Sequence, residues 1–279
     1  MTALNRNYID DIFEHLLRTE QKTPVPMASS ERRACAINWL IKLNGQNGNP
    51  ATVHTARWYL DSVLAICNIR HSSVQILAAA CYWIGQKLHG PSISSQKMIN
   101  FFKGAFSNKS FLAAESAILR KLKFPPLPVI PQDFISYLSW SCDIKNPGET
   151  EIAATFLCLS GILVDKSLCK EFPSAIGAAA VRNAIILLRS QSTLDRLNAN
   201  LVYKVAESKV SNISEICSIQ RKAVTQLSSP LFKYKALLEI YSSFPYEIPQ
   251  KLINSINERT AINKNVCNKN LRLDLVTHI

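Results

Sequence analysis

Apolar residues recur every three or four positions along most of the chain, which is the period of an amphipathic α-helix. Three such stripes consist of Val53, Ala56, Leu60, Val63 and Cys67; of Val74, Leu77, Cys81, Ile84 and Leu88; and of Leu112, Leu119 and Leu122. No segment alternates apolar and polar residues for long enough to predict a β-strand. The pattern therefore predicts an all-α protein.

Turn-forming residues occur where these helices should begin and end. The segment 44–50, Asn-Gly-Gln-Asn-Gly-Asn-Pro, predicts a turn with Asn49 as the N-cap and Pro50 at the first helical position. Gly90 and Pro91 end a later helix, Ser107 precedes another, and four prolines between positions 125 and 131 indicate a linker.

The second half of the chain repeats a feature of the first. Residues 73–80 are Ser-Val-Gln-Ile-Leu-Ala-Ala-Ala, and residues 173–180 are Pro-Ser-Ala-Ile-Gly-Ala-Ala-Ala. Three consecutive alanines make a thin helix, which neighbouring helices can approach closely. We therefore predict two tandem five-helix bundles at 27–127 and 128–246, an N-terminal helix within 1–26, and a basic tail at 247–279.

Composition and charge narrow the class of protein. The 279 residues are enough for two domains, and 47% apolar with 19% charged residues excludes a disordered chain. The net charge of +12 suggests an acidic partner, nucleic acid first. The basic residues are dispersed, however, with no run longer than a pair such as Arg32–Arg33. This favours a diffuse positive surface over a nucleic-acid site.

Other features indicate a reduced, intracellular protein. The eight cysteines form no Cys-x-x-Cys motif and most lie in apolar segments, as expected of reduced structural thiols. The longest nearly uncharged stretch, 152–164, is shorter than a membrane helix needs, and residues 1–11 contain no signal-like apolar run. We expect no membrane association, and the protein to occupy the nucleus and cytoplasm.

Recognisable catalytic motifs are missing. The chain contains no phosphate-binding glycine loop, no Gly-x-Ser-x-Gly and no His-Glu-x-x-His. The five histidines are scattered without metal-ligand spacing. We therefore expect a binding protein rather than an enzyme, with no cofactor and no metal.

Seven segments resemble the cyclin family. The segment 33–40, Arg-Ala-Cys-Ala-Ile-Asn-Trp-Leu, is similar to the first-helix motif of the cyclin box, Met-Arg-Ala-Ile-Leu-Val-Asp-Trp-Leu. Segments 58–61, 84–87 and 114–124 resemble the motifs of the second, third and fifth helices. Segment 8–16 resembles the N-terminal helix of A- and B-type (mitotic) cyclins, and segments 172–180 and 234–243 resemble the second box. The resemblance implies a non-catalytic subunit that binds and activates a cyclin-dependent kinase in cell-cycle control.

The resemblance also implies which residues contact the kinase. In cyclins, positions matching Lys87 and Glu115 form a pair that hydrogen-bonds the kinase backbone, while neighbouring apolar side chains hold the kinase's regulatory helix inward. Phe124 would pack on that helix, and Tyr8 and Ile12 would meet the kinase from the N-terminal helix. A purely structural interpretation remains open, in which Lys87 and Glu115 are charges at the edge of a buried face.

A second implied site is the patch on which cyclins capture Arg-x-Leu peptides. Arg33, Trp39 and Gln75 match it, but its usual Met, Ile and Leu have become Arg32, Cys35 and Ala36. These changes remove apolar area and add a charge, so we expect weakened capture of Arg-x-Leu substrates or inhibitors.

Two alternative functions remain open at this stage. One is a nucleic-acid-associated factor of the same fold, either a transcriptional cyclin or a relative of the transcription factor IIB family, which uses this double fold to bind DNA and is also basic. The other is a degenerate cyclin that acts as an inert scaffold. In addition, Arg57–Leu60 and Arg272–Leu275 match an Arg-x-x-Leu degradation pattern. The first lies in a predicted core helix, so only the second, in the predicted tail, is a candidate.

Overall fold

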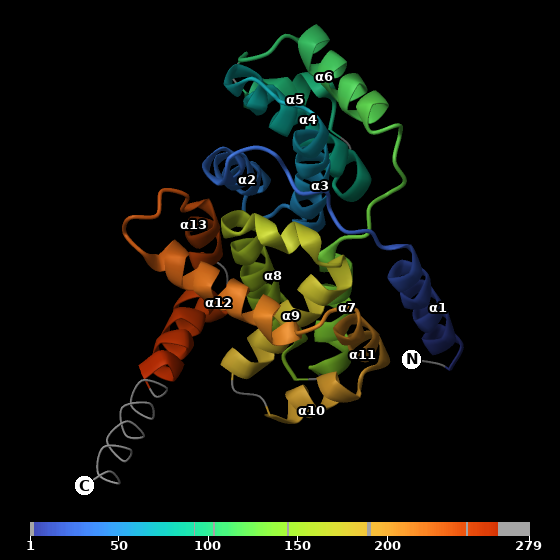
Figure 1. Ribbon diagram of the computed structural model, residues 1–279, viewed down its shortest axis with the longest axis vertical. Coiled ribbons are helices and arrows are strands. Elements are labelled where there is room, and N and C mark those ends of the chain that lie inside the picture. Colours follow the sequence, from blue (N-terminus) through green and yellow to red (C-terminus); the bar gives the residue numbers. More distant parts are fainter. Residues whose placement is uncertain are drawn as a thin grey trace, which may run out of the picture.

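The computed structural model describes residues 3–261 except 92, 103, 144, 189–190 and 244, and leaves the side chains of residues 3–7, 10 and 246 undescribed. Within this part of the chain the regular structure is α-helix and short 3-10 helix, with no β-strand. The all-α prediction is therefore confirmed. Figure 1 shows the first helical bundle at the top of the view and the second below it.

The first bundle consists of five α-helices preceded by an N-terminal helix. They are α1 (Ala3–Thr19), α2 (Ser30–Asn44), α3 (Pro50–Ile66), α4 (Val74–His89), α5 (Ser95–Phe101) and α6 (Asn108–Lys121), with a 3-10 turn η1 (His71–Ser73) before α4. The Asn49 side chain accepts a hydrogen bond from the Ala51 N–H, and Pro50 opens α3, as the sequence predicts. Ser29 and Ser107 cap α2 and α6 in the same way.

The second bundle follows the same plan with its fourth helix divided in two. Its elements are α7 (Pro131–Cys142), α8 (Pro147–Val164), η2 (Lys166–Lys170), α9 (Pro173–Leu187), α10 (Gln191–Ala199), α11 (Leu201–Ser208) and α12 (Ile213–Ser228). Helix α13 (Ala236–Ser242) and a 3-10 turn η3 (Pro245–Glu247) come next. Helix α13 packs against α2 and α8, and so joins the two bundles.

The alanine-rich helices α4 and α9 are the inner helices of their bundles. Ala78–Ala80 and Ala178–Ala180 are almost completely buried. A Cβ on Gly85 in α4 would lie 2.6 Å from the Thr52 carbonyl oxygen, and one on Gly177 in α9 would lie 2.7 Å from that of Pro131. Small residues therefore allow the backbones of neighbouring helices to approach closely, α4 to α3 in the first bundle and α9 to α7 in the second.

Helix α8 is the apolar centre of the second bundle. It is the one helix of the described chain that is long and apolar enough, by length and composition alone, to cross a membrane, yet 67% of that 18-residue window is buried inside the protein. Helices α7, α9 and α12 pack around it. Its composition is that of a core helix.

The predicted tail at 247–279 needs a correction in its first part. Residues 248–261 are helical, and Ile248, Leu252 and Ile256 are buried. The Ser255 hydroxyl donates to the Leu187 carbonyl at 3.0 Å, which attaches this helix to the end of α9. The spacing of four between the buried residues is the amphipathic signal that the sequence interpretation overlooked. The rest of the predicted tail, with Cys267, His278 and Arg272–Leu275, lies outside the described residues.

The described cysteines are free thiols, and five of them are buried: Cys81, Cys142, Cys158, Cys169 and Cys217. Burial raises the pKa of the Cys158 thiol to about 12, which keeps it neutral and unreactive. Cys35, in contrast, is exposed. The expectation of structural thiols holds for the buried five, whose thiols pack as small hydrophobes.

Acid should destabilise the protein through His54. This side chain is fully buried in α3, and neither ring nitrogen has a hydrogen-bond partner among the described residues. Burial, with smaller contributions from Arg57 and His89, lowers its pKa to about 3. The unfolded chain, with a histidine pKa of about 6.5, binds the proton more readily. Stability is therefore complete above about pH 6.5 and falls with acidification, by about 2 kcal/mol at pH 5.

Urea unfolding at several pH values checks this expectation. His54→Gln should flatten the pH dependence between about pH 6.5 and 4. His15→Gln, at an exposed position of α1, is the control and should leave it unchanged. Equal slopes for His54→Gln and the unmodified protein would contradict the assignment.

Candidate functional site

Lys87 and Glu115 form an ion pair between the two helices on which the sequence places them. Lys87 is in the last turn of α4 and Glu115 is in the middle of α6, and the Lys87 ammonium donates to Glu115 Oε1. The Lys87 side chain is 42% exposed and that of Glu115 is 13% exposed. The two residues are 28 positions apart in the chain, yet they lie side by side at the surface.

Two aromatic rings pack beneath the Lys87–Glu115 ion pair, on its side facing the protein interior. The Lys87 ammonium lies 4.2 Å from the centroid of the Trp83 ring, close enough for a cation–π interaction. Trp83 packs on Phe111 of α6 with ring centroids 5.1 Å apart, and Phe111 is completely buried. Because the contact between Trp83 and Phe111 holds α4 against α6, the charged pair has a rigid base.

Exposed apolar side chains lie on the same helices as the ion pair. Leu88 follows Lys87 and is 47% exposed, while Leu112, one turn before Glu115 on α6, is 41% exposed. Such residues on a helix surface offer contact area to a partner. The arrangement combines a charged hydrogen-bonding pair with apolar surface, and is typical of a protein-binding site.

Phe124 lies just beyond the end of α6 in an unusual backbone conformation. Lys123 and Phe124 have φ values of 56° and 49°, which non-glycine residues seldom adopt. Hydrogen bonds from their amides to Arg120 and Leu119 hold the turn. The Phe124 side chain is 69% exposed. Left-handed residues of this kind often occur at functional sites, where the strain serves to present a side chain.

Tyr8 and Ile12 form a second exposed surface on α1. Tyr8 is 69% and Ile12 is 40% exposed, whereas Phe13 on the opposite face is buried against Tyr137 of α7, with ring centroids 4.0 Å apart. Helix α1 also packs on α11 (Figure 1), away from α6. The structure therefore does not bring Tyr8 and Ile12 into contact with Lys87 and Glu115.

A buried carboxylate anchors the segment that follows α1. Glu20 Oε2 accepts a hydrogen bond from the Ser174 N–H at 2.8 Å, and Oε1 accepts one from the Ser174 hydroxyl at 2.7 Å. Ser174 is in the first turn of α9, where backbone N–H groups lack helical partners and the helix dipole favours an anion. Glu20 thus holds the chain after α1 against the second bundle.

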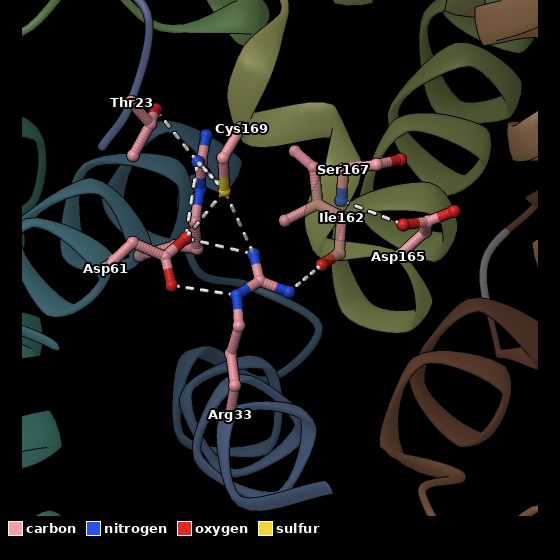
Figure 2. Close-up of polar contacts among 8 residues, drawn as sticks. Thr23, Arg33, Asp61, Ile162, Asp165, Ser167 and Cys169 are labelled. Carbon is pink, nitrogen blue, oxygen red and sulfur yellow. Dashed lines mark hydrogen bonds and ion pairs between the residues drawn. The ribbon is translucent and has the colours of Figure 1, made fainter. Parts of the chain in front are cut away.

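A network of buried charges joins the two bundles (Figure 2). Arg33 of α2 makes two hydrogen bonds to Asp61 of α3, at 2.8 and 2.9 Å, and Arg57 lies 3.4 Å from the same carboxylate. All three side chains are almost completely buried. Burial opposes the charge on Arg33, but Asp61 outweighs it, so the pKa of Arg33 is raised. Two guanidinium groups thus share one carboxylate.

Arg33 also reaches the second bundle. Its Nη1 donates to the Ile162 carbonyl at 2.6 Å, in the last turn of α8, where carbonyl groups lack helical partners. The cation therefore caps α8 and complements the negative end of its dipole. Cys169 adds a thiol that donates to Asp61 at 3.5 Å, and burial, followed by Asp61, raises its pKa. This joint fixes one bundle relative to the other.

The position of Arg33 corrects one sequence prediction. Arg33 was expected in a substrate-docking patch, but only 2% of it is exposed and its guanidinium is fully used inside the protein. It cannot contact a docked peptide, because no part of its charge reaches the surface. Arg33 does match the first-helix motif, but in this protein its side chain stabilises the fold and does not contact a ligand.

The two other predicted docking residues do lie together in a surface groove. Trp39 and Gln75 line a groove of about 660 Å³ whose other lining residues include Glu31, Arg32, Cys35 and Tyr234. Trp39 is partly buried against Phe102, with ring centroids 5.4 Å apart, while Gln75 and Cys35 are exposed. Ala36 also lines the groove, but only 6% of its surface is exposed.

Restoring apolar side chains should strengthen peptide capture in this groove. Arg32→Met with Cys35→Ile adds two aliphatic contacts and removes one charge, so we expect Arg-x-Leu peptides to bind about 5- to 30-fold more tightly. Ala36 is left unchanged because a leucine there would overpack a buried position. Fluorescence titration with a labelled peptide measures the change. Lys42→Met, at an exposed position of α2 outside the groove, is the control; a variant no tighter than this control would contradict the prediction.

No group of three or more metal-ligating side chains lies together among the described residues. The site consists of an ion pair, apolar surface and a separate peptide-sized groove. Such features are typical of surfaces that bind another protein.

Comparisons with known proteins agree with this description. Residues 11–125 match the family model for the cyclin N-terminal domain. G1/S-specific cyclin-D1 of Xenopus laevis is 25% identical over 198 residues, which are 65% of this chain and 67% of that protein. G1/S-specific cyclin-D2 of the same species is 25% identical over 192 residues, 63% of this chain and 65% of that protein. For G1/S-specific cyclin-D1 of Danio rerio the identity is 24% over 237 residues, 83% of this chain and 79% of that protein.

The fold has a counterpart among solved structures. The X-ray structure of a viral cyclin from herpesvirus saimiri superimposes with a TM-score of 0.56 and 17% identity, covering 78% of this chain and 98% of that one. The family model and the relatives named above are those of cyclins, and the viral cyclin structure shares the all-helical fold of this chain.

They also correct the subtype. The sequence motifs indicated A- and B-type, mitotic cyclins, whereas the matching relatives are D-type cyclins whose names specify G1/S. The likeness to A- and B-type cyclins rested on segment 8–16, whereas residues within the box motifs, such as Arg33 and Asp61, serve the ion-pair requirements of the fold. Residues of that kind identify the fold and do not separate its subtypes.

Proposed function

We propose that this chain is a cyclin, a non-catalytic regulatory subunit that binds and activates a cyclin-dependent protein kinase. The observation that carries the proposal is the Lys87–Glu115 ion pair on α4 and α6, set among exposed apolar side chains in the region that matches the cyclin N-terminal domain. Phe124, and Tyr8 and Ile12 on α1, would extend the kinase-binding surface.

The geometry suggests how the pair would act. A lysine ammonium has three donors and a glutamate carboxylate has two acceptor oxygens, so each retains hydrogen-bonding capacity after pairing with the other. The kinase backbone would use that capacity, since charge-assisted hydrogen bonds to a rigid pair give orientation as well as affinity. Leu88, Leu112 and Phe124 would then pack against the kinase's regulatory helix and hold its glutamate near the catalytic lysine.

We place the function at the G1-to-S transition. The relatives that match are named G1/S-specific cyclins, and this supports a role there rather than in mitosis. Nucleus and cytoplasm remain the expected locations. The Trp39–Gln75 groove would receive Arg-x-Leu segments of substrates or inhibitors with reduced affinity, because Arg32 and Cys35 stand where apolar residues are expected.

The transcription factor IIB-like alternative is not favoured. The relatives and the family model that match are cyclins. A DNA-binding role would also not account for the Lys87–Glu115 ion pair at the surface of α4 and α6. An inert scaffold would bind a kinase without activating it, so an activity measurement distinguishes it from an activating cyclin.

Affinity capture tests the proposal at its first step. The full chain, immobilised through a terminal tag, should retain a cyclin-dependent kinase from a lysate of its own cells, identified by mass spectrometry. The Lys87→Ala/Glu115→Ala variant should retain much less of it. Capture of no such kinase, or equal capture by both proteins, would contradict the proposal.

A further inference from the structure

A large groove in the second bundle is not used by the proposed kinase contact. It has a volume of about 1020 Å³ and lies between α9, α12 and the helix at residues 248–261. Figure 1 shows α12 crossing α9, with the red helical segment on the same side of the molecule. Ile186, Leu187 and Ile256 contribute apolar walls. The groove is large enough for a short peptide segment.

The groove is strongly basic. Its lining includes Arg182 from α9, Arg221 and Lys222 from α12, and Arg259 from the last described helix. The acidic residue in the lining is Glu258. Like charges gathered from three separate helices create a positive potential that a neutral or basic partner would not use. The charge thus points to an anionic occupant.

Three of these cations are held in place by the protein. Arg182 donates to the Tyr203 hydroxyl at 2.6 Å and to Glu207 at 3.2 Å. Arg221 donates through Nη1 to Asn183 Oδ1 at 2.6 Å, and Arg259 donates through Nη2 to the Ile186 carbonyl at 2.8 Å. A guanidinium has five N–H donors, so each keeps donors for a ligand after these contacts. An arginine oriented in advance loses less entropy when it binds.

The chemistry of the groove selects among anionic partners. The paired N–H groups of an arginine guanidinium match the spacing of two phosphate oxygen atoms. Clusters of arginine are accordingly a recurring means of recognising phosphorylated peptides. Ser214 and Ser218 add hydroxyl groups to the same wall. A groove bounded by three helices, with Ile186, Leu187 and Ile256 in its walls, suits one extended chain. The chain's own residues 262–279 contain two lysines and an arginine against one aspartate, so their charge opposes occupancy of this groove.

We propose that the groove formed by α9, α12 and residues 248–261 binds a phosphorylated segment of a partner protein, through Arg182, Arg221, Lys222 and Arg259. The site is separate from the Lys87–Glu115 surface, so this inference goes beyond the proposed function and does not depend on kinase binding. Partners would be selected by their phosphorylation state, in addition to any Arg-x-Leu sequence.

Peptide binding by the full chain tests the site. The probe is a labelled peptide pool with one fixed phosphoserine flanked by randomised positions, compared with the same pool containing serine, at about 150 mM salt to screen diffuse attraction. We expect the phosphoserine pool to bind at least about tenfold more tightly. The variant Lys222→Gln/Arg259→Gln should lose about tenfold in affinity for the phosphoserine pool.

Two controls make the outcome decisive. Lys42→Gln/Lys170→Gln removes the same charge from exposed positions outside the groove and should bind like the unmodified protein. The Glu115→Ala variant should also bind phosphopeptides normally, so a failed kinase interaction cannot be mistaken for a failed groove. Equal binding of the two pools, an equal loss in the control variant, or displacement of the peptide by duplex DNA would overturn the proposal.

Discussion

Replacing Lys87 or Glu115 with alanine should weaken association with the kinase by about 2–4 kcal/mol, or roughly 30- to 800-fold in affinity. Each side chain would make charge-assisted hydrogen bonds to kinase backbone groups, and its removal leaves those groups unpaired at the interface. The free energy of unfolding should change by less than about 1 kcal/mol, since the Lys87 side chain is 42% exposed and an exposed ion pair contributes little to stability.

A second ion pair of similar exposure provides the matched control. Lys251 and Glu149 lie 2.7 Å apart, with side chains 48% and 16% exposed, in the second bundle. Lys251→Ala/Glu149→Ala should leave kinase affinity unchanged. Isothermal titration with the purified kinase and thermal melting of each variant separate the two effects. A loss of stability without a loss of affinity in the Lys87 and Glu115 variants would mean that the pair has only a structural role.

Asp61→Asn should destabilise the folded protein by about 3–5 kcal/mol, lowering the melting temperature by on the order of 10 °C. The substitution preserves shape but removes the one carboxylate that Arg33 and Arg57 share in the interior. Two buried guanidinium groups would then face each other without a counter-charge. Because Arg33 also caps α8, the loss should loosen the joint between the bundles.

A triple variant distinguishes charge from packing in this network. Arg33→Met/Arg57→Met/Asp61→Leu removes all three charges while keeping apolar volume, and should be more stable than Asp61→Asn. Urea unfolding gives both free energies. If the triple variant is the less stable of the two, the uncompensated charge is not the cause of the instability.

Local pattern was enough to predict most of the helices. The start of α3 was predicted from Asn49 and Pro50, and the paired alanine segments of α4 and α9 indicated two related bundles, because capping and periodicity depend on neighbouring residues. The family resemblance also picked out Lys87 and Glu115, which the structure places in contact.

Contacts between residues far apart in the chain could not be predicted from the sequence. The bond from Arg33 to the Ile162 carbonyl joins residues 129 positions apart, and no local pattern reveals it, so Arg33 was assigned to the surface. The basic groove likewise gathers cations from α9, α12 and residues 248–261, of which the sequence shows only the pair Arg221–Lys222. Dispersed charge along a chain can thus be concentrated by the fold.

The activity of the captured kinase tests the central claim most directly. Phosphoryl transfer to a peptide substrate should be measured for that kinase alone, with the full chain, and with its Lys87→Ala/Glu115→Ala variant at equal concentration. The account predicts a large increase in rate with the unmodified chain and little or none with the variant. A kinase that binds the chain yet remains inactive, or one activated equally by both, would contradict it.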